Sequence, residues 1–241
     1  MIPKAADLNH PIIGLQIKSK TNKQYHRKDI IMPGEDLLIR EQTLQVQRDI
    51  VDLEWIMFTG VHGGGGRNFT EDEQRAFATM RLAQFSSWEK FPLDSYINDL
   101  RTALDANRNM FAEKYYYMIE ETDPETFIKA KPFLPIIDDT SRELIDLITD
   151  QYRIWEKELA AVFPRVVNAA LPMDNMTEGA DKSYTHYLNC EIKTYSKKTL
   201  TMLYSSLVAF PEKNRYRMSL EYLMKAYGFA SLEEAEKAMT R

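Results

Sequence analysis

Apolar residues recur at helical intervals in two long stretches of the chain, one in each half. In the first stretch the intervals are seven, four and three residues, and the side chains that follow them are Leu44, Val51, Trp55 and Phe58. In the second stretch six side chains share one face, namely Leu144, Ile148, Tyr152, Trp155, Leu159 and Val162. Side chains at such intervals lie on one side of an α-helix and pack against a core. The pattern predicts one long helix from residue 35 to about residue 60 and another that ends near residue 162.

Local signals at helix ends predict the remaining elements. Thr70 and Glu73 have the spacing of a capping box, and Ser231 and Glu234 repeat it near the end of the chain. Proline suits the first turn of a helix, and two further helix starts coincide with one. The predicted helices cover residues 71–90, 92–106, 109–121, a short element from 124, then 182–195, 198–210, 213–227 and a last one from 231. We expect an irregular loop over residues 164–181.

The order of these elements repeats, and the repeat predicts the fold class. Shifting the sequence by 107 residues aligns residues 80–121 with residues 187–228 without a gap. No Asn-Gly or Asp-Gly pair occurs in the chain, so hairpins are not expected. We expect one all-α domain, internally duplicated, whose halves (residues 35–131 and 136–241) are related by a pseudo-twofold axis. Residues 1–34 are expected to form an irregular arm in front of it.

Composition limits the compartment and the partners. The chain has 241 residues, of which 44% are hydrophobic and 28% charged, as in ordinary globular proteins. A single cysteine, Cys190, cannot form an internal disulfide, which favours a reducing compartment and therefore the cytoplasm. The net charge of −5 argues against a nucleic-acid partner, and the basic run within residues 8–28 is expected to be a solvated arm. No segment has the roughly 20 apolar residues of a membrane span or the order of a signal peptide, so we expect a soluble protein with no membrane partner and no export.

Metal and cofactor motifs are not found. The four histidines stand at positions 10, 26, 62 and 186, and none belongs to an HExxH or Glu-x-x-His pattern. Cys190 is expected to be a small buried apolar residue. We therefore expect neither a metal nor a cofactor.

A polar stripe inside an aromatic one is the most informative feature of the sequence. Four residues at helical intervals form it, Phe77, Arg81, Gln84 and Trp88, and the positions 107 residues later are Tyr184, Leu188, Glu191 and Tyr195. If the two stripes face each other, Arg81 reaches Glu191. Such an enclosed charge must be satisfied by the protein or by a ligand, because an unpaired buried charge is very unfavourable.

Two functions are compatible with this stripe. In the first, a small-molecule pocket between the halves is lined by Trp55, Trp88 and Tyr195, and the protein is a binding protein or an enzyme acting on an amine- or carboxylate-bearing metabolite. Its polar residues would be Arg67 and Arg81 holding an anion, Gln84 orienting it, and Glu191 or Glu54 acting as acid or base. In the second, the protein is a non-catalytic binding or interaction module, and Arg81 and Glu191 form a structural ion pair. Unsatisfied charges in a pocket would favour the first, and a closed ion pair would favour the second.

A glycine run precedes the helix that carries the stripe. The four glycines at positions 63–66 lead through Arg67 to the capped helix start, an arrangement that suits an anion at Gly65 and Gly66. The run matches neither the phosphate-binding GxxxxGK[ST] motif nor the GxGxxG turn. A lid or a plain linker is an equal alternative.

Several spaced motifs resemble one known family. They are Glu54–Phe58 (EWIMF), Gly65–Arg67 (GGR), Met80–Phe85 (MRLAQF) with Trp88, Arg108–Asn109 and Glu113–Tyr115 (EKY). Together they are similar to a bacterial domain family of unknown function that is common in anaerobic Firmicutes, over about residues 45–240. The family usually has a small residue, an Asp or Ser, a Cys and a Gln after Gly-Gly-Arg, whereas this chain has Asn68–Glu71. The resemblance implies that Trp55, the glycine loop, Arg81, Gln84 and Trp88 belong to one site, and it implies no reaction.

Overall fold

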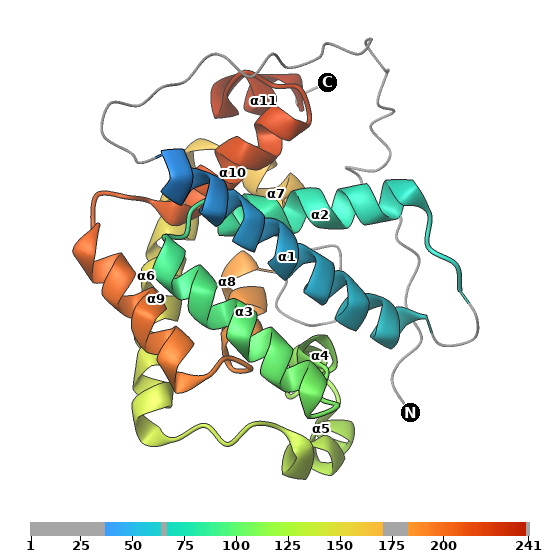
Figure 1. Ribbon diagram of the computed structural model, residues 1–241. Coiled ribbons are helices and arrows are strands. Elements are labelled where there is room, and N and C mark those ends of the chain that lie inside the picture. The colour runs from blue at the N-terminus through green and yellow to red at the C-terminus, as the bar shows by residue number, and fades with distance from the viewer. Residues whose placement is uncertain (1–36, 64–66, 171–182, 240–241) are drawn as a thin grey trace.

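The computed structural model describes residues 37–63, 67–170 and 183–239, and this part of the chain contains eleven α-helices, one 3-10 helix and no strand (Figure 1). In chain order the elements are α1 (Leu37–His62), α2 (Glu71–Phe85), α3 (Lys90–Asp105), α4 (Met110–Met118), α5 (Pro124–Ala130), η1 (Lys131–Phe133), α6 (Asp139–Val162), α7 (Pro164–Ala169), α8 (Tyr184–Ile192), α9 (Lys197–Ala209), α10 (Arg215–Ala226) and α11 (Leu232–Ala238). The predicted all-α fold class is confirmed. The arm expected at residues 1–34 lies outside the described residues.

The two long helices, α1 and α6, pack against most of the later helices. α1 contacts α2, α3 and α4, and α6 contacts α7, α8, α9 and α10. Three further contacts join the first part of the chain to the second: α3 with α9, α2 with α10, and α4 with α8. Figure 1 shows α8 near the centre of the molecule, behind α1 and α3. Side chains from distant parts of the sequence therefore meet around α8.

The periodicity of α6 identifies the core face of that helix. The periodicity of α1 identifies only part of the core face of α1. On α6, Ile148, Tyr152, Trp155 and Leu159 are buried, although Val162 at the end of the helix is 64% exposed. On α1, Val51 and Phe58 are buried, but Leu44 is 45% exposed, so the predicted stripe does not extend to that residue. The buried face of α1 also contains Gln47, Ile50, Glu54 and Met57. A carboxylate thus stands on the inner face of the first long helix.

Most predicted helix starts agree with the structure, and the ends agree less well. The Thr70 capping box is present, with the Glu73 amide donating to Thr70 Oγ1 at 3.2 Å and the Thr70 amide to Glu73 Oε2 at 2.8 Å. At α11 Ser231 caps the helix, but Glu234 accepts from the amide of Ala230 instead of closing a box. α2 ends at Phe85, five residues before its predicted end, because a turn over residues 86–88 redirects the chain into α3.

The irregular loop predicted for residues 164–181 is wrong in its first part. Residues 164–169 form α7, which begins at a proline, and a proline at this position needs no hydrogen bond from its nitrogen. The remainder of the predicted loop, residues 171–182, lies outside the described residues.

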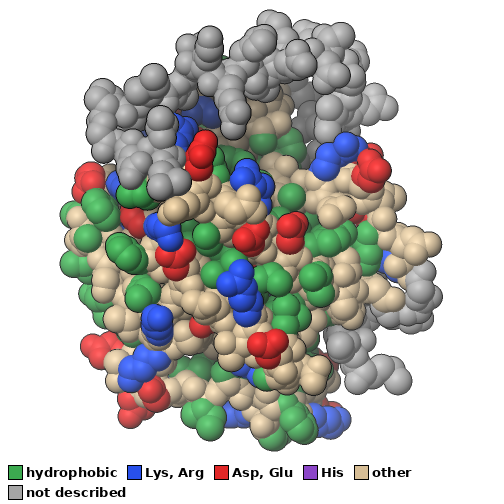
Figure 2. Space-filling model, in the orientation of Figure 1, with side chains coloured by type: hydrophobic (Ala, Val, Ile, Leu, Met, Phe, Trp, Pro, Cys, Tyr) green, Lys and Arg blue, Asp and Glu red, His purple; other side chains and the backbone are tan. Residues whose placement is uncertain are grey.

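The surface drawn in Figure 2 has no single-sign patch of charge. Lysine and arginine side chains are interspersed with aspartate and glutamate over this face, and apolar side chains are scattered between them. Among the described helices, none combines the length with the apolar character that a membrane crossing requires.

Candidate functional site

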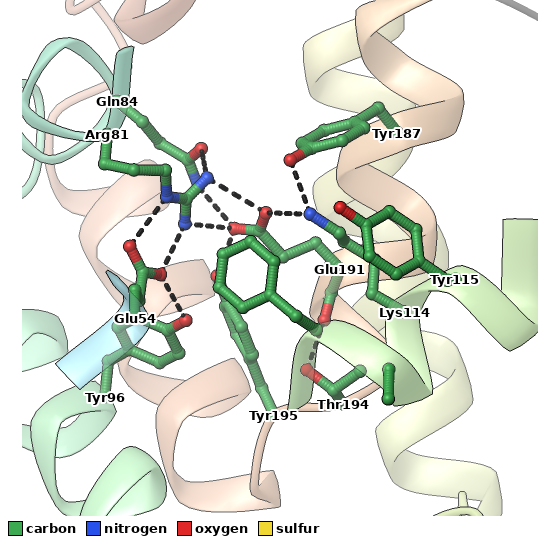
Figure 3. Close-up of polar contacts among 12 residues, drawn as sticks. Glu54, Arg81, Gln84, Tyr96, Lys114, Tyr115, Tyr187, Glu191, Thr194 and Tyr195 are labelled. Carbon is green, nitrogen blue, oxygen red and sulfur yellow. Dashed lines mark hydrogen bonds and ion pairs between the residues drawn. The ribbon is translucent and has the colours of Figure 1, made fainter. Parts of the chain in front are cut away.

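Six buried polar side chains from four helices and a turn meet at the centre of the molecule (Figure 3). α1 contributes Glu54, α2 contributes Arg81 and Gln84, α3 contributes Tyr96, α8 contributes Glu191, and the turn after α8 contributes Tyr195. We call this group the Arg81 network. All six side chains are at least nine-tenths buried, so their charges and hydrogen-bonding groups must be satisfied locally.

The guanidinium group of Arg81 lies between two carboxylates. Its Nε and Nη2 atoms each donate to Glu54 at 2.7 Å. Its Nη1 and Nη2 atoms donate to Glu191 at 3.0 and 2.9 Å, and Nη1 also donates to Gln84 Oε1 at 2.8 Å. Arginine has five N–H donors, and these contacts use all five. In this structure Arg81 holds no remaining donor for another anion.

The two carboxylates are also satisfied by protein groups. The hydroxyl of Tyr96 donates to Glu54 Oε1 at 2.7 Å. Glu191 Oε1 accepts from Gln84 Nε2 at 2.8 Å and from the Tyr195 hydroxyl at 2.7 Å. Charge-assisted bonds of this length are the strong class of hydrogen bond. The Arg81 network is therefore closed, with each charge paired and hydrogen-bonded.

A lysine stands at the edge of the network. Lys114 on α4 is 2% exposed, and its Nζ lies 3.9 Å from Glu191 Oε2. The same ammonium group donates to the hydroxyl of Tyr187 on α8 and lies 4.3 Å from the ring centre of Phe111. Two buried cations, Arg81 and Lys114, thus lie beside two buried carboxylates, Glu54 and Glu191.

Burial and the neighbouring charges move the pKa values of the two glutamates in opposite directions. Burial raises the pKa of Glu54, and the charge of Arg81 opposes this rise without reversing it. Burial alone would also raise the pKa of Glu191, but the charges of Arg81 and Lys114, with hydrogen bonds from Arg81 and Tyr195, lower it to about 2. Burial raises the pKa of Tyr96 and of Tyr195, and the nearby glutamates add to the rise. Both phenols therefore remain hydrogen-bond donors to the carboxylates.

The contact predicted between the two stripes is present. Arg81 contacts Glu191, and Gln84 contacts the same residue, which lies 107 positions later. Glu54 and Tyr195 join them. The predicted site residues Arg81, Gln84, Glu191, Glu54 and Tyr195 are therefore brought together in one place.

Trp88 and Trp55, the two tryptophans predicted to line the pocket, lie in different places. Trp88 is buried beside the network, and its ring centre lies 6.0 Å from that of Tyr96 and 6.2 Å from that of Tyr195. Its indole Nε1 is buried and has no hydrogen-bond partner among the described residues. Trp55 belongs to a separate aromatic cluster, with ring centres 5.3 Å from Phe69 and 5.2 Å from Phe77.

Arg67, which follows the glycine run, does not reach the network. Arg67 pairs with Glu73 at 2.6 Å, and its guanidinium lies 5.0 Å from the ring centre of Phe69. Gly65 and Gly66 lie outside the described residues. The structure therefore brings Arg67 to the start of α2 and does not place it with Arg81.

A small cavity lies beside the network, between α2, α8 and α10. Its volume is about 60 Å³. The side chains that line it include Met80, Arg81, Gln84, Tyr184, Tyr187 and Tyr216. Neither Glu54 nor Glu191 is part of this lining. We call this space the α2–α8–α10 cavity.

Several residues of this region were not predicted from the sequence. Tyr96, Lys114 and Tyr187 complete the polar contacts, and Tyr184 and Tyr216 line the cavity. Lys114 had one available signal, because it is the only basic residue in the largely apolar helix α4. Tyr96 and Tyr216 had none, since a tyrosine on an apolar helix face is ordinary core.

A second buried arginine also joins distant elements. Arg215 at the start of α10 is fully buried, and its Nη2 pairs with Glu89 Oε2 at 2.7 Å. It also donates to the backbone carbonyl oxygens of Ser87 and Ser206. Among the described residues no group of three or more His, Cys, Asp or Glu side chains is arranged to hold a metal ion.

Comparison with known proteins gives one family match. The model of the family described as Protein of unknown function (DUF4125) matches residues 44–237. No curated protein and no solved structure matches the chain. The matched range contains every residue of the Arg81 network and of the cavity lining, and it covers more than half of the sequence. The chain therefore belongs to the DUF4125 family of proteins of unknown function.

Proposed function

We propose that this protein is a non-catalytic, small-molecule-binding helical domain, whose ligand enters the α2–α8–α10 cavity while the Arg81 network forms a fixed structural wall beside it. One observation carries the proposal. The hydroxyl groups of Tyr184 and Tyr216 are buried without a partner among the described residues, and both tyrosines line the cavity. Buried polar groups are normally hydrogen-bonded, so an unpaired pair beside a cavity indicates a missing partner.

The closed network supports binding rather than catalysis. A general acid or base must lie within hydrogen-bond reach of the atom it protonates or deprotonates. Glu54 and Glu191 are occupied by Arg81, Tyr96 and Tyr195, and neither lines the cavity. An enzymatic role for these carboxylates would require the network to open.

The same packing supports an internal duplication, which we propose as the origin of the central site. If α1, α2, α3 and α4 correspond to α6, α8, α9 and α10, the contacts of α1 correspond to those of α6, apart from the contact of α6 with α7, which has no counterpart. The contact of α2 with α10 then corresponds to that of α8 with α4. The contact of α3 with α9 joins two corresponding helices, so the correspondence leaves it unchanged. Such a pattern is expected for two halves related by a pseudo-twofold axis.

We also propose a compartment, a class of partner and an origin for this protein. Cys190 is buried and forms no disulfide, which is in keeping with a cytoplasmic protein. The net charge of −5 and the mixed charges in Figure 2 favour a small-molecule partner over nucleic acid. We propose a bacterial origin from the sequence resemblance.

A ligand screen with a cavity-filling variant tests the proposed function. Ala170 lines the cavity and is buried, so Ala170→Leu is expected to fill part of the space. At a hundredfold excess over Kd a ligand stabilises the folded state by about 2.7 kcal/mol, which raises Tm by several degrees. We expect a ligand among metabolites of mixed charge to raise the Tm of the wild type and not that of Ala170→Leu.

The control for this screen is Ala209→Leu, which makes the same change at an exposed position at the end of α9. It should respond to ligand as the wild type does. An equal Tm rise in Ala170→Leu would place binding elsewhere and would contradict the proposal.

A further inference from the structure

We propose that the part of the ligand that enters the α2–α8–α10 cavity is uncharged and carries a hydrogen-bond acceptor, such as a ketone, amide or ether oxygen, which the hydroxyls of Tyr184 and Tyr216 bind. This inference rests on the binding function proposed above and specifies the class of ligand. It differs from the amine- or carboxylate-bearing metabolite expected from the sequence.

The charge balance of the cavity wall favours a neutral group. Among the described residues of the lining, Arg81 is the one charged side chain, and its five donors are used by Glu54, Gln84 and Glu191. To pair with Arg81, an anion would have to displace one of these carboxylates from the guanidinium group, and without that pairing it would be an uncompensated buried charge. A cation would be placed beside a buried positive charge with no carboxylate in the lining to pair with it. Only an uncharged group leaves the network intact.

The available hydrogen-bonding groups select an acceptor. Burial raises the pKa of Tyr184 and of Tyr216, so both phenols remain protonated and each has one O–H to donate. The two rings are stacked, with their centres 4.6 Å apart and their planes tilted by 24°. Ser219, also in the lining, already donates its hydroxyl to the carbonyl oxygen of Arg215 at 3.0 Å. Tyr187 and Gln84, which also line the cavity, already bond to Lys114 and Glu191. Tyr184 and Tyr216 are thus the lining side chains whose hydroxyls have no partner among the described residues.

The size of the cavity limits what enters it. At about 60 Å³ it is less than half of the roughly 150 Å³ engineered cavity that takes up benzene. A group of about four non-hydrogen atoms is therefore appropriate. Apolar side chains such as Met80, Leu220 and Leu223 form much of the remaining wall, which suits the methyl or methylene groups next to the acceptor.

Three probes of one shape and different charge test the inference. Acetone is neutral, acetate is an anion and acetamidinium is a cation, and each is planar with four non-hydrogen atoms. We would titrate each into protein carrying ¹³C-labelled tyrosine and follow the ring resonances of Tyr184 and Tyr216 by NMR, assigned from Tyr184→Phe and Tyr216→Phe. The inference predicts that acetone shifts both resonances with saturation, and that acetate and acetamidinium bind at least tenfold more weakly.

Tyrosine variants separate hydrogen bonding from nonspecific solvent effects. The double variant Tyr184→Phe with Tyr216→Phe should bind acetone about tenfold more weakly, because each donor is lost while the ring remains. The control Tyr222→Phe, on α10 but partly exposed and outside the lining, should bind like the wild type.

The outcomes distinguish this inference from the proposed function. Acetate or acetamidinium binding as tightly as acetone at the two tyrosines would overturn the neutral ligand and leave a binding cavity. Unchanged acetone affinity in the double variant would overturn the role of the hydroxyls. If no probe moves the two resonances, the inference fails, and the metabolite screen with Ala170→Leu still decides the proposed function independently.

Discussion

At the scale of single residues, Arg81 explains most of the centre of the molecule. One guanidinium group with five donors connects α1, α2 and α8 through Glu54, Gln84 and Glu191. The pairing of Arg81 with Glu191 could be predicted because both occupy a polar position in an aromatic stripe. The contact with Glu54 could not, because the inward face of α1 depends on how that helix is rotated against α2 and α3. The periodicity of α1 suggested a face containing Leu44, which is in fact exposed.

The stability of the protein should depend on pH through Glu191. Its pKa is lowered to about 2 from an ordinary 4.5, so its ionised form stabilises the fold fully above pH 4.5. This contribution is lost as the pH falls from 4.5 towards 2. Between these limits the difference in unfolding free energy between the wild type and Glu191→Gln should shrink by roughly 3 kcal/mol, measured by urea unfolding.

The comparison with the variant isolates this carboxylate. Glu54 has a raised pKa and contributes the opposite trend, in which stability is lost as the pH rises, but burial, the largest cause of this rise, acts in both proteins. Glu143→Gln, at an exposed site on α6, should reproduce the wild-type curve. A wild-type pH dependence in Glu191→Gln would show that Glu191 is not paired as described.

At the scale of helices, starts were easier to predict than ends. Thr70, Asp123 and Ser231 each cap a helix by accepting a bond from the amide three residues later, and such short-range contacts can be predicted from the sequence. The end of α2 at Phe85 has no glycine or proline signal, since Ser86 keeps a helical backbone conformation. α7 was missed because its six residues are too few to show a period.

Asn109 should contribute more to the stability of the fold than its position at the start of α4 suggests. Its side-chain oxygen accepts from the amides of Phe111 and Ala112 at 3.0 and 3.1 Å, and its nitrogen donates to the carbonyl oxygen of Met57 at 2.8 Å. Asn109→Ala removes a cap and the bond from α4 to α1. We expect a loss of about 1–2 kcal/mol in the free energy of unfolding, measured by urea denaturation.

A matched asparagine provides the comparison for this cap. Asn98 is exposed on α3 and bonds only within that helix, to the carbonyl oxygen of Asp94 at 2.8 Å. Asn98→Ala should change stability by less than about 0.5 kcal/mol. If the two variants are equally stable, neither the cap nor the link between α4 and α1 contributes to stability.

At the scale of the whole molecule, the sequence predicts the class of fold and the contact between the two polar stripes better than it predicts the helix boundaries. Gln84 and Glu191, 107 residues apart, are in direct contact. The same alignment matches Asn107 with Asn214, but Asn107 lies two residues beyond the end of α3 with a φ of 54°, whereas Asn214 caps α10. The cavity and the closure of the network could not be predicted, because both depend on how helices distant in sequence cross.

Equilibrium unfolding of Arg81→Met tests most directly whether the Arg81 network is a structural unit. Removing the guanidinium group leaves two buried carboxylates without their shared partner, so the variant should lose about 3–5 kcal/mol of unfolding free energy. Arg101→Met, at an exposed position of α3, should stay within about 0.5 kcal/mol of the wild type. An Arg81→Met protein as stable as the wild type, or more stable, would contradict the account and would indicate that these charges are maintained for a ligand.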